Sequence, residues 1–474
     1  MLTESLKPYE YLWSPDNLPG SPGWQAINNG HAYVREMPET LEYLATDSRW
    51  PAFFPAPMCL VTTTDGVQTA LEKVVGASIV DRFPYVMALS FCQQPLSERH
   101  HARQSFMDIL EQGGTAAVQF LPPGPLLDQA MRTILSTPDE QTHQRIARTG
   151  LATRKAITID APVFEDAYLV YEMRLASPTK DFYGHPIYTT PWINVGSHRV
   201  YFLEIKTIQL RQDIAAGQSQ IYWRSLPVWQ SIEPSPPMII PEMPASLADR
   251  YIKKYNPHYF FPSDGTVAFE ADSFQNDMAI KHLPPLPEDQ IEVDNDRARW
   301  PSFFPSSTCM ITTKTQAGIP NAMPCGSTTI ISRHPLVIAV CVAYANINQR
   351  YAPRATLDII RESGRFGCGV PFIDERVIQA INYTGNISLK DDPKKVFHAG
   401  LAIAASETEA PADWSPVFPD LPIHFECHVT GEIRLGTHIM FLGEVQRIRV
   451  RADVTTNNPQ EWCPWADVVL VNKH

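Results

Sequence analysis

The sequence lacks the features of a membrane-spanning or nucleic-acid-binding protein. No apolar run approaches the length needed to cross a bilayer, and the first residues, Met1–Pro8, contain no apolar signal core. The 39 lysines and arginines are outnumbered by 51 aspartates and glutamates, so no basic stripe is present to neutralise a phosphate backbone. We therefore expect a cytoplasmic protein with a small-molecule substrate and neither nucleic acid nor membrane as a partner.

Cysteine pairs and the common catalytic signatures are also missing. The eight cysteines are scattered without a CxxC pair, and most lie among small or apolar residues, which is typical of buried, reduced thiols. No GxGxxG, P-loop, HExxH or GxSxG occurs in a fitting context. His424, Glu426 and His428 alternate along an expected strand and share a face. We interpret them as a polar barrel face and predict no metal site.

The sequence does contain a long internal repeat. The stretch Arg49–Pro55 reads Arg-Trp-Pro-Ala-Phe-Phe-Pro and returns as Arg-Trp-Pro-Ser-Phe-Phe-Pro at Arg299–Pro305, about 250 residues later. Four residues further on, Cys59–Thr63 is answered by Cys309–Thr313. Tryptophan and phenylalanine are rare, so an internal duplication is the better explanation than chance.

The repeat divides the chain into two domains. Gly196–His198 is answered by Gly436–His438 at an offset of only about 240, so the first copy carries roughly ten extra residues. These fall in Ser177–Trp192, a stretch with loop composition. A proline-rich segment at 234–244 indicates an extended linker. We predict domains at 1–240, with an N-terminal extension, and 241–474.

The pattern of apolar residues predicts a mainly β fold with short helices. In the second copy, β-branched and apolar runs alternate with turn residues, and two short stretches have helical composition. The expected strands are 308–313, 328–332, 336–344, 365–370, 424–435 and 438–450, and the expected helices are 355–364 and 375–383. About six strands with two short helices suit a small antiparallel barrel, so we predict two tandem barrels.

The order of motifs in the second copy resembles the flavin reductase-like family of FMN-binding split barrels. The segments that carry the resemblance are Thr312-Thr313, Asn321–Ser327, Arg333–Pro335, Arg354–Thr356, Gly364–Phe366 and Gly436–Val445. The resemblance covers about 150 residues here and, more faintly, the same span of the first copy. It implies FMN held where two barrels meet, which family members achieve as homodimers. A tandem copy would build that pair within one chain, as a pseudo-dimer that needs no further dimerisation.

Several residues are candidates for holding the cofactor. A phosphate requires backbone N–H groups at a turn or helix start, with a fixed cation and hydroxyls nearby. The second copy offers Arg354 and Thr356 where a helix begins, and Gly326, Ser327 and Thr328 at a turn. The resemblance sets Asn321 and Cys325 against the flavin ring, and in the first copy Arg103 and Ser105 are the predicted binding residues. The alternative is a surface ion pair for Arg354 and a helix cap for Thr356.

His438 is the catalytic candidate. By resemblance, a histidine after Gly436-Thr437 lies near the ring face where nicotinamide or substrate would stack. The alternative is a structural histidine, because His198 repeats it in the first copy. The first copy also departs from the pattern: Leu71 answers Asn321 and Ala77 answers Ser327. We therefore expect one working site, with its phosphate pocket in the second copy.

The resemblance implies an FMN-dependent oxidoreductase that passes hydride between NAD(P)H, or a small organic substrate, and flavin. One alternative is a flavin-independent binding scaffold or cofactor-free enzyme that takes a bulky apolar metabolite in the same interface pocket. A third interpretation is a haem-binding split barrel.

Overall fold

A computed structural model gives the architecture of the chain. It describes residues 24–27, 32–37, 59–74, 76–94, 102–122, 125–181, 183–216, 219–223, 271–283, 309–345, 354–371, 375–404, 415–452 and 468–472. The repeated aromatic motif at 49–55 and 299–305 and the proline-rich segment at 234–244 lie outside the described residues.

The first half folds around an antiparallel sheet whose strands are rich in β-branched and aromatic residues. Its strands are β3 (Cys59–Thr64), β4 (Thr69–Val74), β5 (Ala77–Arg82), β6 (Tyr85–Cys92), β7 (Thr115–Phe120), β10 (Leu169–Leu175), β13 (Trp192–Val195) and β14 (His198–Arg211). The helices are α2 (Gln104–Gly113), α3 (Pro125–Ser136), the 3-10 helix η3 (Asp139–Gln144), α4 (Arg145–Thr149) and α5 (Gln212–Ala215). Two further short antiparallel pairs lie in this half, β8 (Thr153–Lys155) with β9 (Pro162–Phe164) and β11 (Thr179–Lys180) with β12 (Pro186–Ile187). A third pair joins β15 (Ser219–Trp223) to β25 (Val468–Asn472), near the other end of the chain.

The second half repeats this arrangement. Its strands are β18 (Cys309–Lys314), β19 (Pro320–Cys325), β20 (Thr328–Arg333), β21 (Leu336–Ala343), β22 (Arg365–Val370), β23 (Ile423–Arg434) and β24 (His438–Arg451). Its helices are α7 (Ala355–Ser363), α8 (Glu375–Asn386) and α9 (Lys395–His398). Most of the strands and helices expected from the sequence are therefore present close to their expected bounds. β19 forms a hairpin with β18, and α9 is an addition.

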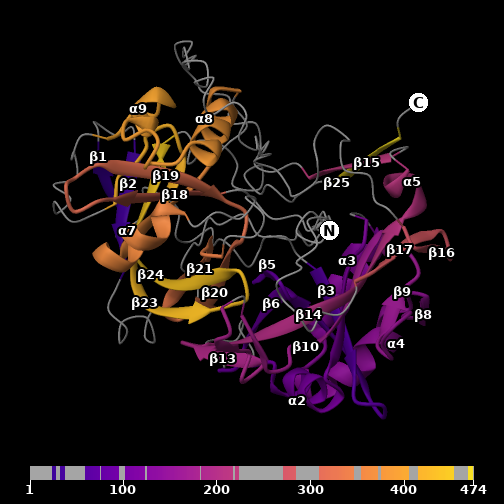
Figure 1. Cartoon of the computed structure of the whole chain (residues 1–474). Coiled ribbons are helices and arrows are strands. Elements are labelled where there is room, and N and C mark those ends of the chain that lie inside the picture. The colour runs from indigo at the N-terminus through magenta and orange to yellow at the C-terminus, as the bar shows by residue number, and fades with distance from the viewer. Residues whose placement is uncertain are drawn as a thin grey trace.

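The two sheets share one strand order. In the first half β14, β10, β7, β3 and β4 are successive neighbours, and in the second half β24, β23, β22, β18 and β19 correspond to them. The pair β5–β6 joins β14 as β20–β21 joins β24, so the long strand near the end of each half connects both parts of its barrel. Figure 1 shows the two halves side by side, with α7, α8 and α9 on one and α2 and α4 on the other. The predicted mainly β fold, with two split barrels, is confirmed.

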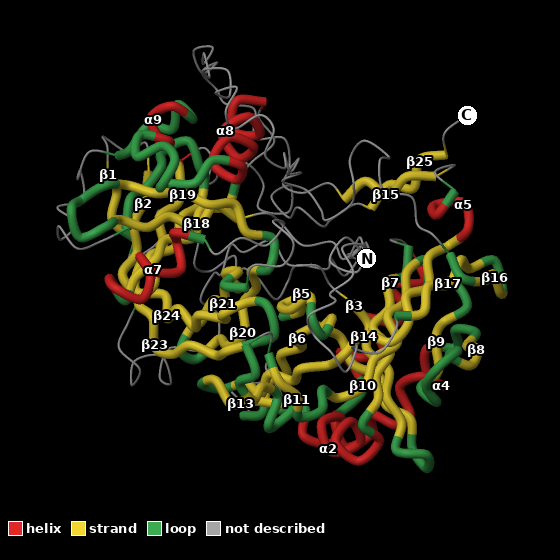
Figure 2. Tube along the Cα trace, in the orientation of Figure 1, coloured by secondary structure: helices red, strands yellow, loops and turns green. Residues whose placement is uncertain are grey.

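One hairpin of each half lies in the sheet of the other half. The hairpin β1 (Gln25–Ile27) and β2 (Ala32–Glu36) pairs with β24, near the far end of the chain. Reciprocally, β16 (Ser273–Gln275) and β17 (Met278–His282) pair with β14. Figure 2 shows β1 and β2 at the edge of the second barrel and β16 and β17 at the edge of the first barrel. The boundary near residue 240 stays a prediction, but the units on either side of it exchange hairpins.

This exchange leads to a testable expectation. A protease site inserted within 224–270 and cut after purification should give two fragments that elute together, because each fragment keeps a hairpin paired in the other's sheet. Size-exclusion chromatography before and after cleavage measures this. Fragments that separate without denaturant would contradict the exchanged arrangement.

The seam between the barrels has its own apolar core. Buried side chains from β5, β6 and β14 pack against side chains from β20, β21 and β24. The strands β6 and β21 are buried along all eight residues, because one face lines the barrel and the other lies in this seam. This explains the near-continuous apolar run that the sequence shows at 336–344.

Polar contacts at the seam are centred on the turns before β14 and β24. The carboxylate of Asp81 accepts hydrogen bonds from the Gly436 N–H (2.5 Å), the Thr437 N–H (2.8 Å) and the Thr437 hydroxyl (2.6 Å). The Tyr188 hydroxyl donates to the same carboxylate at 2.7 Å. Gly436 permits this approach, because a Cβ there would lie 1.6 Å from the carbonyl oxygen of Phe83. The carboxylate thus fixes the residue that precedes His438.

The extra segment of the first copy also reaches the second barrel. Residues 177–192 were predicted as a loop, and the described ones are loop apart from the two-residue strands β11 and β12 and Trp192, where β13 begins. Asp181 in this segment accepts hydrogen bonds from the Tyr344 hydroxyl (2.7 Å) and from Arg434 (3.1 Å). The insertion therefore contributes a buried carboxylate that orients side chains of the second half.

Strand register corrects the alignment of the two copies. Asn321 pairs with Thr313, and the residue paired with Thr63 is Ala70 rather than Leu71. The prediction that Ala77 corresponds to Ser327 is also wrong. The carbonyl of Gly76 accepts a hydrogen bond from the Ser90 N–H, and the carbonyl of Ser327 accepts the equivalent bond from the Cys341 N–H, so Gly76 is the counterpart. The one-residue difference arises in the hairpin that follows β3 and β18, which is one residue longer in the second copy. The first copy still has no asparagine at this position, because Ala70 takes the place of Asn321.

Candidate functional site

The start of α7 is held by a buried polar cluster. The side-chain amide of Asn321 donates to the Thr313 hydroxyl (3.0 Å) and to the Thr356 hydroxyl (2.9 Å). Asn321 is completely buried and Thr356 is 2% exposed. Within the described part of the chain, the Oδ1 atom of Asn321 has no hydrogen-bond donor. Asn321 thus joins α7 to β18 and β19, and it positions the helix start rather than facing solvent.

Arg354 precedes α7 and lies at the meeting point of three elements. Its N–H donates to the carbonyl of Ala343 at the end of β21 (3.2 Å), and its guanidinium donates to the carbonyl of Gly385 in α8 (3.2 Å). Ala343 is also the strand partner of His438. The predicted phosphate and catalytic residues are thus brought to one region, around the end of β21.

The remaining predicted cofactor residues of the second copy follow β19. Cys325, Gly326 and Thr328 are buried, and Ser327 is partly exposed. The Cys325 thiol donates to the carbonyl of Cys341 (3.4 Å), and the Thr328 hydroxyl donates to the carbonyl of Cys325 (3.3 Å). In this segment, Ser327 is the residue with surface available to a ligand, and the others shape the turn.

Both repeated histidines lie at the seam. The His438 Nδ1 atom is 2.7 Å from the Thr437 hydroxyl, and the His198 Nδ1 atom is 2.8 Å from the Ser197 hydroxyl. Burial lowers the pKa of His198 to about 3, so this imidazole is neutral at physiological pH. The structural role weighed for these histidines finds support in these contacts with the neighbouring hydroxyl groups.

Carboxylates occupy the corresponding region of the first barrel. The Arg103 guanidinium lies 2.7 Å from the Glu72 carboxylate, which is fully buried. The Ser105 N–H, in the first turn of α2, donates to the Asp139 carboxylate (2.7 Å). Carboxylates satisfy a helix N-terminus and an arginine in the same way as a phosphate does. This geometry disfavours the cofactor role predicted for Arg103 and Ser105, which would require an anion to displace both groups.

The second barrel lacks these two carboxylates. Leu389 lies 250 residues after Asp139, and Met323 takes the register position of Glu72. The structure records no carboxylate against the Thr356 N–H among its described residues. The start of α7, with Arg354 and the Ser327 hydroxyl, therefore fits a phosphate better than its counterpart in the first barrel. Sequence reasoning missed Glu72 and Asp139, because neither belongs to a recognisable motif.

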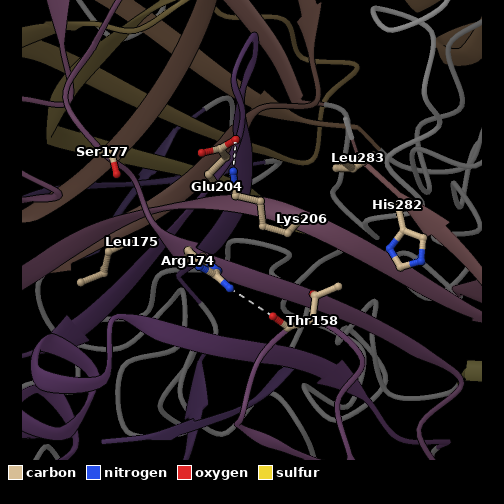
Figure 3. Close-up of a pocket in the computed structure, with 8 residues that line it drawn as sticks. All are labelled: Thr158, Arg174, Leu175, Ser177, Glu204, Lys206, His282 and Leu283. Atoms are coloured by element: carbon tan, nitrogen blue, oxygen red, sulfur yellow. Dashed lines mark hydrogen bonds and ion pairs between the residues drawn. The ribbon is translucent and has the colours of Figure 1, made fainter. Parts of the chain in front are cut away.

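A cavity elsewhere is lined by residues of the first barrel and of the hairpin that pairs with β14. Its volume is about 460 Å³, and strands β10, β14 and β17 supply most of its lining. In Figure 3 Lys206 points to Glu204 and Arg174 points to Thr158, so the charged groups are engaged within the wall. The lining residues are Thr158, Arg174, Leu175, Ser177, Glu204, Lys206, His282 and Leu283. None of the predicted site residues lines this cavity.

The described residues contain no group of three or more histidine, cysteine, aspartate or glutamate side chains that could hold a metal ion. His424 and Glu426, which share a sheet face as expected, are buried, and burial raises the pKa of Glu426 to about 7. None of the described helices is long and apolar enough to span a membrane.

Comparison with protein families identifies the second half. Residues 301–466 match the family described as "Flavin reductase like domain". The second barrel therefore matches this family, and the resemblance predicted from the sequence is confirmed for that half. An uncharacterized protein of Halalkalibacterium halodurans, BH2278, is 27% identical over 150 residues, which is 32% of this chain and 67% of that protein.

Solved structures similar to this chain include the following two. Flavoredoxin of Desulfovibrio vulgaris (Miyazaki F) is 22% identical, with a TM-score of 0.26, over 31% of this chain and 70% of that one. Nitrilotriacetate monooxygenase component B from Bacillus cereus is 21% identical, with a TM-score of 0.31, over 41% of this chain and 98% of that one.

Proposed function

We propose that the chain is an FMN-dependent oxidoreductase with one flavin site, located where α7 of the second barrel begins. The observation that carries the proposal is the presence of Arg354, Thr356 and Ser327 in a flavin reductase like domain, without the carboxylates that fill the equivalent region of the first barrel. Arg354, the α7 start and Ser327 hold the phosphate. Asn321 positions Thr356, and Cys325, Gly326 and Thr328 shape the turn beside the ring.

FMN, when bound, supplies the hydride-transfer chemistry, with NAD(P)H or a small organic molecule as the second reactant. The protein contributes position and electrostatics. Thr437 is fixed by Asp81 and holds the His438 ring through Nδ1. His438 is the proposed group for binding or protonating the substrate at the seam. Buried apolar side chains of the seam, among them Leu435 and Met440, flank this region in the sequence.

The closed anion site of the first barrel favours a second, flavin-independent role for that barrel. Because Glu72 and Asp139 already occupy its arginine and helix start, we propose that the first barrel serves as a structural wall and partner.

The proposal is tested by titrating FMN into the purified protein. Arg354→Met should weaken FMN binding by about 10- to 100-fold, because a charge-assisted hydrogen bond contributes about 1.5–3 kcal/mol. Arg361→Met is the matched control, since Arg361 lies on the same helix and forms an exposed pair with Glu432. Equal FMN affinity in the Arg354 variant, or no FMN binding by the unmodified chain, would contradict the proposed site.

A further inference from the structure

The two barrels place a second cation at equivalent positions. Arg145 begins α4 and Lys395 begins α9, 250 residues later. The Arg145 guanidinium donates to the carbonyl of Thr137 (2.8 Å), and the Lys395 ammonium donates to the corresponding carbonyl of Ile387 (3.2 Å). Both side chains are buried, with Arg145 0% and Lys395 3% exposed. The side chains thus occupy one structural position in two copies.

The partner of this cation differs between the copies. In the first barrel, the Glu72 carboxylate binds both Arg145 (2.5 Å) and Arg103 (2.7 Å), so one internal anion lies between two cations. Glu72 pairs with Val61, and in the same register Met323 pairs with Ile311. The second barrel therefore keeps two cations, Lys395 and Arg354, but has a thioether where the shared carboxylate would be.

We propose that Lys395 is the second cation of the phosphate site in the second barrel. In the first barrel, the Glu72 carboxylate occupies the position between the two cations that a ligand phosphate would take. The inference rests on the proposed function and extends it, because it names a residue outside the segments that carried the resemblance and gives a reason for a single site. The ligand class is a phosphate monoester, whose dianion balances two cations.

The surroundings of Lys395 make this site responsive to pH. Burial, followed by the charge of Arg354, lowers the pKa of Lys395 to about 7, and the nearby Asp392 carboxylate opposes this shift. Asp392 itself is bonded to His398 (2.7 Å) and Tyr383 (3.1 Å), so its charge is shared. A bound dianion favours the protonated ammonium. FMN binding above pH 7 should therefore take up a proton, and the affinity should fall as the pH rises.

Lysine variants provide the first test. Lys395→Met should weaken FMN binding about tenfold at pH 7 and remove the decline in affinity above pH 7. Lys395→Arg, which installs the residue found in the first barrel, should restore affinity without that decline. Riboflavin, which has no phosphate, should bind all three proteins equally. A Lys395→Met protein that binds FMN as the unmodified chain does, with the same pH profile, would overturn the inference.

Transferring the carboxylate provides the second test. Met323→Glu should reduce FMN affinity at least tenfold by neutralising Lys395 and Arg354, while the melting temperature stays within a few degrees of the unmodified chain. A Met323→Glu protein that stays folded and keeps full FMN affinity would overturn the inference. Inorganic phosphate, titrated separately, distinguishes the two failures. If phosphate binding depends on Lys395 but FMN does not bind, the anion site stands and the proposed flavin function fails. If the unmodified chain binds neither, both fail.

Discussion

Replacing Arg145 by methionine is expected to lower the free energy of unfolding by about 3–5 kcal/mol, because it leaves the Glu72 carboxylate buried with half of its compensation. Glu72 is fully buried and its Oε2 atom contacts both Arg145 and Arg103. Arg145 also donates to the carbonyls of Leu71 (3.0 Å) and Thr137 (2.8 Å), which lose their donor in the same variant. Chemical denaturation at pH 7 measures the loss.

A control on the same helix separates this effect from the loss of a positive charge. Arg148 is exposed and bonds to Gln141 and Gln144, so Arg148→Met should change stability by less than about 1 kcal/mol. The double variant Glu72→Met with Arg145→Met removes the anion together with its cation and should recover most of the stability. Equal effects of Arg145→Met and Arg148→Met would show that the Glu72 cluster is not a stabilising unit.

Replacing Asp81 by alanine is expected to cost about 3 kcal/mol, because the Gly436 and Thr437 N–H groups and the Tyr188 hydroxyl lose a buried acceptor. Burial raises the pKa of Asp81 to about 6, above its unfolded value of 3.8. The folded protein therefore binds this proton more tightly, and the contribution of Asp81 to stability falls as the pH rises from about 4 to about 6. Denaturation curves across this range should show that fall in the unmodified chain and lose it in the variant.

The second barrel offers the matched control. Ser332 takes the register position of Asp81, and its hydroxyl lies 3.5 Å from the Ser197 hydroxyl. Ser332→Ala should therefore cost less than about 1 kcal/mol. If Asp81→Ala is as mild as Ser332→Ala, the seam depends on its apolar core rather than on this carboxylate.

The sequence predicted the succession of strands and helices along each copy because the signals are local. Alternating and continuous apolar runs, and Gly114 and Gly364 in left-handed conformation at the ends of α2 and α7, act within a few residues. The hairpin exchange was not predictable in this way. The free edges of β14 and β24 are equivalent by duplication, so nothing in the composition of 25–36 or 273–282 indicates which edge each hairpin joins.

The part of the candidate site that was predicted also depends on signals that lie close together in the sequence. Arg354, Thr356 and Asn321 belong to a recognisable motif order, and the structure brings their side chains or backbone around the start of α7. Glu72, Asp139 and Lys395 act over long sequence separations, so their roles emerge only when strand register aligns the copies. The wrong counterparts of Asn321 and Ser327 have one cause. The second copy has one extra residue in the hairpin after β18, and sequence matching placed this insertion further along the chain.

The stoichiometry of FMN binding tests the central claim most directly. Equilibrium dialysis or calorimetry of the full chain should give one FMN per chain, with Arg354→Met abolishing most of the binding and Arg103→Met leaving it intact. Two FMN per chain, or one that depends on Arg103, would contradict a single site in the second barrel.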